Sequence, residues 1–530
     1  MDLLLISAVI LLCILLNKLT ARLGIPMLLA FIGLGMVFGS DGLLKVPFES
    51  LDFAQQVCTA ALIIIMFYGG FGTSWSRARP VALKAGLLSS LGVVMTAALV
   101  GLFCRFALGF PTLESFLVGS VVSSTDAATV FSLLRSKRLN LKNNTASLLE
   151  LESGSNDPCA YMLTLVLLSV MTGRQAGHAI AYTIFAQLAY GAAFGVAIAC
   201  AALYFLRKFS FDTVGFDTVF VLAVAILAYA APTAVGGNGY LSTYIVGIIL
   251  GNRRIANKKE LTHFFDAFTG LTQMLIFFLL GLLSSPSRLP AVLLPAVLIA
   301  LFLTFVARPA AVFSLLSPLR CSFRQQLLVS WAGLRGAASI VFAIIAALSS
   351  ASFQNDIFHI VFLVVLLSIA FQGSLLPYVA RKLQMIDDSA DVLKTFTDYS
   401  EEIPVQYMDL NIPEGHAWAG QAVRDILFPP DSLLVLVIRD GEQLIPRGKT
   451  VILAGDKLVL SAPAVSDALR IRLTEIGITK SSEWNGKRIA DMPGDADRLV
   501  MLIKRGKKII IPSGNTRVQE NDILVISGGE

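Results

Sequence analysis

The segment Glu152-Ser-Gly-Ser-Asn-Asp157-Pro158 places two carboxylates inside an otherwise apolar run, residues 146–172. A run of this length matches the roughly 20 residues that a helix needs to cross a bilayer. Ionisable side chains at membrane depth are costly, and they usually pair, line a cavity or carry ions. Pro158 removes a helical N–H group and can loosen the helix directly beside Asp157. The segment therefore predicts a membrane-spanning helix that carries an ion site.

The composition of the whole chain also indicates a membrane protein. Of 530 residues, 55% are hydrophobic and 15% are charged, whereas a soluble protein carries about 25% charged residues. This excludes a purely soluble enzyme, a disordered protein and a secreted disulfide scaffold. Residues 386–530 hold 17 Lys+Arg and 22 Asp+Glu, against 25 and 14 in residues 1–385. The tail therefore has a soluble composition, and the net charge of +6 is not a nucleic-acid signature.

Thirteen apolar segments are candidate membrane-spanning helices, which predicts an all-α membrane domain. They are 2–18, 24–40, 57–73, 81–108, 113–135, 146–172, 179–206, 217–232, 239–251, 267–284, 290–316, 326–349 and 357–382. The first lacks a preceding basic region and a small-residue cleavage site, so we expect a retained span and not a cleaved signal. Alternate loops hold 18 and 4 Lys+Arg. Because cytoplasmic loops are rich in these residues, the N-terminus is predicted outside and the C-terminus in the cytoplasm.

The tail contains an internal repeat with an offset of 66 residues. Trp418 matches Trp484, and Asp456 matches Asp522. Both copies alternate β-branched residues around an Asp-Gly or Arg-Gly turn, a pattern typical of hairpins. No complete Walker A motif is present in the tail. The predicted domains are a membrane domain (1–385), an acidic linker (386–402) and two small modules (403–470 and 471–530).

Three ionisable residues from different spans are predicted at one depth. At about 1.5 Å per residue, Asp126 lies roughly 20 Å from the outer face, and Asp157 and Arg335 lie roughly 17 and 14 Å from the inner face. These depths are near the middle of a hydrocarbon core about 30 Å thick, which suggests one shared site. Glu152 is the candidate partner for the Arg335 charge. A buried acid–arginine pair can also serve only as a structural clamp, so each residue taken alone leaves that alternative open.

The sequence around these charges is small and polar. One span reads Val122-Ser-Ser-Thr-Asp-Ala-Ala128, and another reads Gly333-Leu-Arg-Gly-Ala-Ala-Ser339. A helix that is broken at such a segment offers free backbone carbonyls and amides to an ion. In the span 146–172, Ser153 and Asp157 lie one turn apart and share a face.

These residues carry a family resemblance that covers about residues 1–385. Glu152-Ser-Gly-Ser-Asn-Asp157 resembles the E-S-x-x-N-D motif of monovalent cation/proton antiporters of the sodium/hydrogen exchanger (NhaP-like) family. Thr125-Asp126 resembles the Thr-Asp pair of that family, and Gly333-Leu-Arg-Gly-Ala337 resembles its G-L-R-G-A motif. The tail modules resemble RCK C-terminal (TrkA-C-like) domains. The combination is similar to the cell-volume-regulation protein A branch of bacterial potassium/proton antiporters.

The resemblance implies inverted repeats, crossed broken helices and a homodimer, followed by small α+β modules. It implies that Asp157 carries both proton and cation, with Ser153 and the Thr125 backbone as further cation ligands. Asn156 would pair with Asp126 or Thr125, and Asp126 would balance helix-end dipoles. Glu152 and Arg335 would form a structural ion pair. Some family members carry an acid in the third span near the ion, whereas 57–73 has none here.

The predicted function is secondary active exchange of a monovalent cation, potassium or sodium, for protons. Asn and not a second Asp at position 156 leaves one titrating group at the motif, which predicts electroneutral exchange. The alternatives are a cation channel and a transporter-like membrane sensor, although no TVGYG-type filter is present. We expect no enzyme activity, no cofactor, no transition metal and no nucleic-acid partner. We expect a bacterial inner-membrane location, contact with lipid, and a tail that binds a small regulatory ligand such as a nucleotide.

Overall fold

The computed structural model divides the chain into two compact units, residues 1–400 and 401–530. It describes residues 7, 9–16, 26–48, 50–126, 129–131, 134, 139–173, 178–209, 215–253, 255, 257–387, 405–429, 432–439, 442–463, 473–480, 482–491, 499–505, 508–510 and 512–527. Most of the predicted linker 386–402 lies outside these residues, as do residues 2–6, 8, 17 and 18 of the predicted first span.

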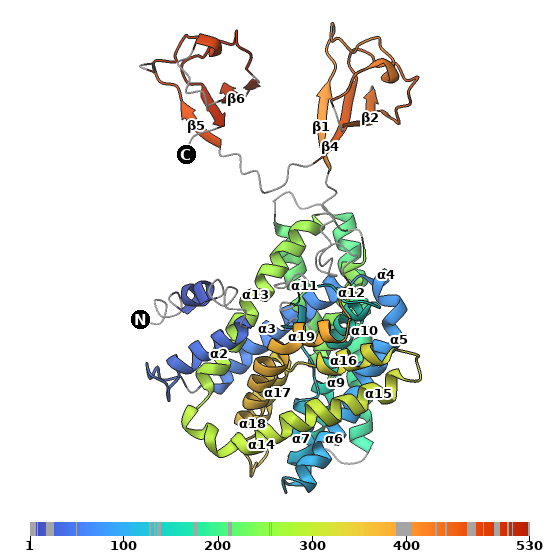
Figure 1. The fold of residues 1–530 in the computed structure, drawn as a ribbon, viewed down its shortest axis with the longest axis vertical. Coiled ribbons are helices and arrows are strands. Elements are labelled where there is room, and N and C mark those ends of the chain that lie inside the picture. Colours follow the sequence, from blue (N-terminus) through green and yellow to red (C-terminus); the bar gives the residue numbers. More distant parts are fainter. Residues whose placement is uncertain are drawn as a thin grey trace. The chain divides into compact units, whose positions relative to one another are not determined.

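Among the described residues of the first unit, the regular elements are helices, joined by loops and one isolated β-bridge (Figure 1). Its helices are α2 (Met27–Phe38), α3 (Leu51–Gly72), α4 (Trp75–Ala78), α5 (Ala82–Leu87), α6 (Val93–Phe106), α7 (Thr112–Val121), α9 (Thr145–Met171), α10 (His178–Lys208), α11 (Phe216–Ala234), α12 (Gly239–Gly251), α13 (Lys258–Leu283), α14 (Leu289–Phe302), α15 (Arg308–Leu316), α16 (Phe323–Trp331), α17 (Ala337–Leu348), α18 (Ile357–Leu367) and α19 (Ser374–Lys382). Short 3-10 or π turns join α4 to α5, α5 to α6, α14 to α15, and α18 to α19.

Every predicted span from 24–40 onward coincides with helical segments, and residues 9–16 of the first span are also helical. By length and composition, seven helical stretches in the described part of the chain can cross a membrane. Four further apolar helices are shorter: α2, α7, α12 and α17. The prediction of a helical membrane domain is confirmed, and the number of thirteen crossings stays a prediction.

Two helical stretches are interrupted where the sequence is small and polar. α7 ends at Val121, residues 122–126 are not helical, and helix resumes at 129–131. α16 ends at Trp331, and α17 begins only at Ala337. The two interruptions meet, since the Asp126 amide donates to the Leu334 carbonyl at 2.8 Å. The expected crossing of broken helices is therefore present.

Glycine allows close backbone contact within one part of the helical unit. A Cβ atom at Gly247 in α12 would collide with the backbone of Phe67 and Phe71 in α3. A Cβ atom at Gly191 in α10 would lie 2.9 Å from the Asn238 carbonyl, at the start of α12. We call α3 and α10 to α13 the scaffold helices, because α12 packs against α3, α10 and α11, and α13 packs against α3.

The two ends of the continuous helical stretch formed by α18 and α19 mark two opposite faces of the helical unit. One face holds residues 139–145, 322–326 and 381–387, which are joined by the Leu141–Ile386 bridge and the bond from Gln325 to Asn143. We call it the basic face, because Lys142, Arg320, Arg324, Arg381 and Lys382 lie in its loops and helix ends. The opposite face holds Asp41 and Ser287, which hydrogen-bond at 2.7 Å, and Glu114, which accepts from Gln354.

The second unit contains two four-stranded antiparallel sheets of identical topology. The first has the order β1-β4-β2-β3 and the second has the order β5-β8-β6-β7. The strands are β1 (Val405–Asn411), β2 (Leu433–Arg439), β3 (Glu442–Leu444), β4 (Lys457–Pro463), β5 (Leu473–Gly477), β6 (Leu499–Arg505), β7 (Lys508–Ile510) and β8 (Ile523–Ser527). The predicted hairpins are β2–β3 and β6–β7. No α-helix lies among the described residues of this unit, so the α part of the expected α+β modules is not seen there.

Each module is closed by the same buried clamp. Arg439 donates through Nε and Nη2 to both oxygens of Asp456 at 2.8 Å. Arg505 makes the equivalent pair of bonds to Asp522 at 2.8 and 2.7 Å. The clamp joins the end of β2 or β6 to the turn before β4 or β8, so the repeat in the sequence corresponds to a repeat in structure.

Candidate ion-binding site

Asp157 lies near the middle of α9 and is 8% exposed. Its carboxylate accepts a hydrogen bond from the Ser124 hydroxyl, which comes from the interrupted segment after α7. It also lines a cavity of about 370 Å³ with residues of α3 and α13. Among the described residues, the hydrogen bond from Ser124 is the one that this carboxylate receives. Its remaining lone pairs are available to a ligand in the cavity.

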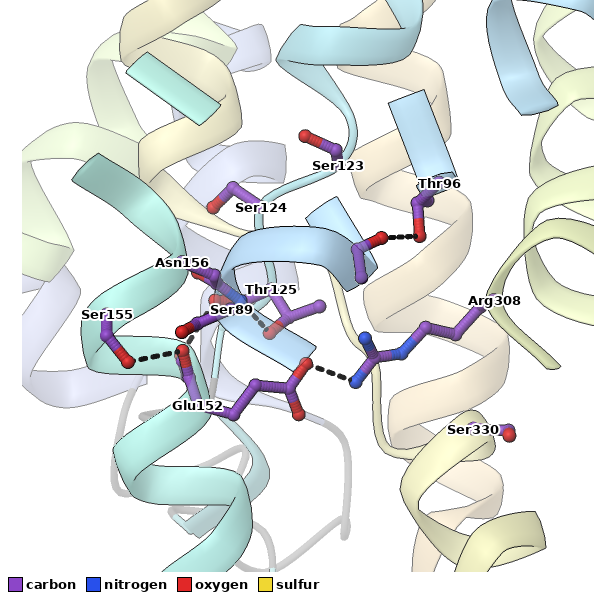
Figure 2. Close-up of polar contacts among 12 residues, drawn as sticks. Ser89, Thr96, Ser123, Ser124, Thr125, Glu152, Ser155, Asn156, Arg308 and Ser330 are labelled. Carbon is purple, nitrogen blue, oxygen red and sulfur yellow. Dashed lines mark hydrogen bonds and ion pairs between the residues drawn. The ribbon is translucent and has the colours of Figure 1, made fainter. Parts of the chain in front are cut away.

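One turn of α9 holds the interrupted segment in place. The Ser153 hydroxyl donates to the Thr125 carbonyl at 2.7 Å. The Asn156 amide donates to the Thr125 hydroxyl at 2.5 Å, so of the two partners expected for Asn156 the structure shows Thr125. Figure 2 shows Asn156 and Thr125 side by side between the two elements. Ser153 and Asn156 therefore supply hydrogen bonds to groups of Thr125 that have no helical partners, because the helix is interrupted at residues 122–126.

Asp126 lies where the two interrupted helices cross. Its carboxylate accepts from the Thr129 amide at 3.2 Å and from the Thr129 hydroxyl at 2.6 Å. A Cβ atom added at Gly336 would lie 2.5 Å from the Asp126 Cβ. The carboxylate therefore sits against the residue that precedes α17, close to the beginnings of two helical segments, where negative charge is favourable.

The predicted ion pair between Glu152 and Arg335 is replaced by a different pair. Arg308, at the start of α15, places Nη2 2.6 Å from Glu152 Oε1, and the two side chains are 4% and 1% exposed. Figure 2 shows the Arg308 side chain reaching toward Glu152. The Arg335 Nη1 instead donates to the carbonyls of Ser123 and Ser124, each at 2.7 Å. The position of Arg335 along its span predicted that it lies near the site. The way the helices cross decides which groups its side chain reaches.

The two glycines of Gly333-Leu-Arg-Gly336 each make room for a charged side chain. A Cβ atom at Gly333 would lie 2.8 Å from the Arg308 Nε, and one at Gly336 would collide with the Asp126 carboxylate. The motif therefore supplies one arginine and space for two more charged groups.

Three residues at this site were not predicted from the sequence. Arg308 interrupts the apolar run 290–316, and a search for buried bases beside buried acids finds it. Ser124 is visible only as one of several small polar residues. Asp266 lines the cavity and accepts from the Tyr68 hydroxyl at 2.9 Å, but the predicted span began one residue later, at 267. It supplies an acid in the cavity although 57–73 has none.

The five charged groups nearest the helix crossing sum to one negative charge, and Glu150 and Asp266 are further acids that line the cavity. Three carboxylates (Asp126, Glu152 and Asp157) face two guanidinium groups (Arg308 and Arg335), and all of these residues except Asp126 are buried. One bound monovalent cation or one proton would balance the set. Because isolated charge is costly at membrane depth, the site favours one of these two occupants.

Crossed interrupted helices with buried carboxylates beside a cavity are typical of secondary transporters. The family model described as "Sodium/hydrogen exchanger, transmembrane" matches residues 7–382, and the TrkA-C domain matches residues 407–466 and 473–530. The chain belongs to the sodium/hydrogen exchanger family, a family of transporters, and carries two TrkA-C domains.

Curated relatives agree with this membership, and a solved structure has a similar fold. The chain is 33% identical over 464 residues to the K(+)/H(+) antiporter NhaP of Alkalimonas amylolytica, covering 87% of this chain and 81% of the relative. It is 31% identical to the K(+)/H(+) antiporter NhaP2 of Shewanella sp. (strain ANA-3), covering 84% and 78%. The fold is similar to the sodium proton antiporter MjNhaP1 from Methanocaldococcus jannaschii, with a TM-score of 0.64, 24% identity, and coverage of 72% of this chain and 99% of that chain.

Proposed function

We propose that this protein exchanges potassium for protons across a membrane, with Asp157 as the shared carrier of the two ions. The observation that carries the proposal is the Asp157 carboxylate, which faces the cavity with one hydrogen bond from Ser124. A channel or a membrane sensor is not favoured, because the relatives of this chain are named as antiporters.

Competition at one carboxylate is sufficient for coupled exchange. Asp157 binds either a proton or a monovalent cation, and the loaded site moves between the two faces by alternating access. Asn and not a second Asp at position 156 leaves one titrating group at the motif, which predicts electroneutral exchange of one cation for one proton.

The other site residues have supporting roles in this proposal. Ser153 and the Thr125 backbone are cation ligands beside Asp157, and Asn156 fixes the Thr125 side chain. Asp126 balances the helix ends at the crossing. Glu152 and Arg308 form the structural ion pair, and Arg335 fixes the carbonyls of the interrupted segment.

The cation is proposed as potassium because the two relatives are named as potassium/proton antiporters. The test uses proteoliposomes with an imposed pH gradient, a trapped pH dye and a clamped membrane potential. Potassium and sodium are added in separate experiments. Saturable collapse of the gradient by potassium supports the proposal, and collapse by sodium alone would change the cation. Cation flux without proton movement would indicate a channel.

We further propose that the domains have the predicted bounds, 1–385, 386–402, 403–470 and 471–530. The tail modules regulate transport by binding a small cytoplasmic ligand such as a nucleotide, and the protein is a homodimer of the bacterial inner membrane with its N-terminus outside. Deletion of the chain after residue 387 tests the regulatory role. Unchanged rate, pH profile and ligand response after the deletion would reject it.

A further inference from the structure

The two sides of Asp157 differ in how α9 meets the scaffold helices. Toward the basic face, the cavity separates α9 from α3 and α13, and it is lined there by Glu150, Tyr68 and Asp266. Toward the opposite face, Pro158 and Tyr161 follow Asp157 on α9, and both are buried against other elements. Toward the basic face, α9 borders the cavity and contacts the scaffold at Gly154, where an added Cβ atom would lie 2.5 Å from the Tyr244 ring. Toward the opposite face, α9 is hydrogen-bonded to the scaffold.

Asn238 makes a direct hydrogen bond from the scaffold to the residue beside the carrier. Its amide donates to the Pro158 carbonyl at 2.8 Å, and the side chain is fully buried. The side-chain oxygen of Asn238 caps α12 by accepting from the Leu241 amide at 3.0 Å. The backbone N–H of Asn238 donates to the Gln187 carbonyl in α10 at 3.1 Å. Asn238 is thus bonded to the scaffold through its side-chain oxygen and its backbone N–H, and its amide nitrogen lies between the Pro158 carbonyl and, at 3.4 Å, the Gln187 side-chain oxygen.

Aromatic rings close the same side of the site. Tyr161 of α9 packs edge-on against Tyr240 of α12, with ring centroids 4.9 Å apart. Tyr240 also contacts Tyr229 of α11 at 4.9 Å, and Tyr161 contacts Phe342 of α17 at 5.7 Å. Tyr240 is fully buried. Two of the rings come from the scaffold, and two come from the helices that form the ion site.

Alternating access requires one of the two sides to open while the other closes. We infer that Asn238 and Tyr240 form the closure that separates Asp157 from the opposite face, and that this closure breaks and reforms in each transport cycle. The inference rests on the proposed exchange function and extends it to named positioning residues. Asn238 acts through Pro158, and Tyr240 acts through Tyr161.

The test measures cation affinity from each face separately, using full-length protein in vesicles of determined orientation. Asn238→Ser keeps a helix-capping side chain that is too short to reach Pro158. Loss of one hydrogen bond changes an equilibrium by about fivefold, and apparent affinity follows the fraction of molecules open to that face. We expect the apparent KM for potassium at the opposite face to fall about fivefold, with a rise or no change at the cavity side.

Two further variants test the same closure, and the second of them leaves position 238 unchanged. Asn238→Asp keeps the cap and removes the amide donor, and Tyr240→Leu removes the ring contact; both are expected to change KM in the same direction. Phe67→Leu is the matched control, because Phe67 is equally buried but contacts Phe71 and Phe265 within the scaffold. The control is expected to lower the melting temperature without changing the ratio of the two KM values.

An equal KM change at both faces, or no change in any variant that folds, would overturn the inference and leave Asn238 as a helix cap. If the unmodified protein shows no potassium/proton exchange, the proposed function fails instead. In that case, amide hydrogen exchange in the peptides around Pro158 and Tyr240 still tests whether Asn238 holds α9 against the scaffold. Faster exchange in Asn238→Ser than in Phe67→Leu supports it, and equal exchange rejects it.

Discussion

Asp157 in the membrane domain and Asp456 in the first tail module are both buried carboxylates, but their hydrogen bonding differs. Asp456 accepts from Arg439 Nε and Nη2 and from the Leu453 amide, at 2.7 to 2.8 Å. Asp157 accepts from Ser124 and faces a cavity. A carboxylate whose lone pairs are satisfied by the protein stabilises the fold, whereas one with vacant lone pairs beside a cavity can bind an ion. The number of protein donors separates the two roles.

The largest expected effect comes from Asp157→Asn. Asparagine keeps the volume and an acceptor for Ser124, so we expect a folded protein whose potassium/proton exchange falls at least about 100-fold, equivalent to about 2.7 kcal/mol in the barrier. The pH-dye assay in proteoliposomes measures it. Asp41→Asn, in a loop of the opposite face, is the control and is expected to transport normally. Substantial exchange by Asp157→Asn would show that donor number does not identify the carrier.

The second prediction concerns the ion pair that holds the site. Arg308→Ala leaves the Glu152 charge buried without its partner, which costs about 3–5 kcal/mol. We expect a lower melting temperature and folded yield, measured by thermal unfolding and size-exclusion chromatography. The double variant Glu152→Gln/Arg308→Gln removes both charges and is expected to recover part of the loss. The opposite result would contradict this assignment of the pair. In that result, Glu152→Gln would restore the stability lost in Arg335→Ala but would not restore the stability lost in Arg308→Ala.

The third prediction tests the space beside Asp126. A Cβ atom at Gly336 would collide with the Asp126 carboxylate, and overpacking costs roughly 1–3 kcal/mol. We expect Gly336→Ala to reduce the exchange rate by about tenfold or more, since Asp126 must move. Gly86→Ala is the matched control, because no atom lies within 4 Å of a Cβ there. Equal rates in the two variants would mean that the position of Asp126 does not affect transport.

The smallest expected effect is in the tail clamp. The hydrogen bonds from Arg439 hold the pKa of the Asp456 carboxyl below its ordinary value, so its contribution to stability is present above about pH 3.9 and is lost as pH falls below that value. Asp456→Asn is expected to destabilise the module by about 1–3 kcal/mol at pH 7, with little difference from the unmodified module at strongly acidic pH. Pulse proteolysis of the full-length protein, followed by detection of the fragments from 405–463, measures it.

The control for the clamp is Asp425→Asn. Asp425 is exposed, and its nearest contact with Arg424 is 3.6 Å, so its loss is expected to change stability by less than about 0.5 kcal/mol. A similar loss in both variants would show that burial and donor number do not distinguish them.

Much of the fold could be predicted because it depends on local chemistry. Apolar runs marked the helices, and segments such as 122–126, rich in Ser and Thr, marked the break in α7. The 66-residue repeat predicted two modules with matching hairpins. Arg439 and Arg505 obey the same repeat, but only the structure shows that they bind Asp456 and Asp522.

The partners of the buried charges could not be predicted in the same way. The position of a residue along its helix gives only its depth in the membrane. An ion pair also depends on where the two helices lie in the membrane plane and on which way the side chains point. Arg335 has the depth that the sequence indicates, but its guanidinium group faces the carbonyls of Ser123 and Ser124. Arg308 reaches Glu152 because Gly333 leaves room for its side chain.

By itself, the sequence determined the class of protein, the apolar segments that form helices, the two segments where helices are interrupted, and the carboxylate at the centre of the site. Those features follow from hydrophobicity, residue size and the cost of burying a charge, all of which are properties of short segments. Tertiary structure alone decided which arginine pairs with Glu152, how few donors Asp157 receives, and that Asn238 contacts the residue beside it. These depend on how helices far apart in the chain cross, which local composition does not encode.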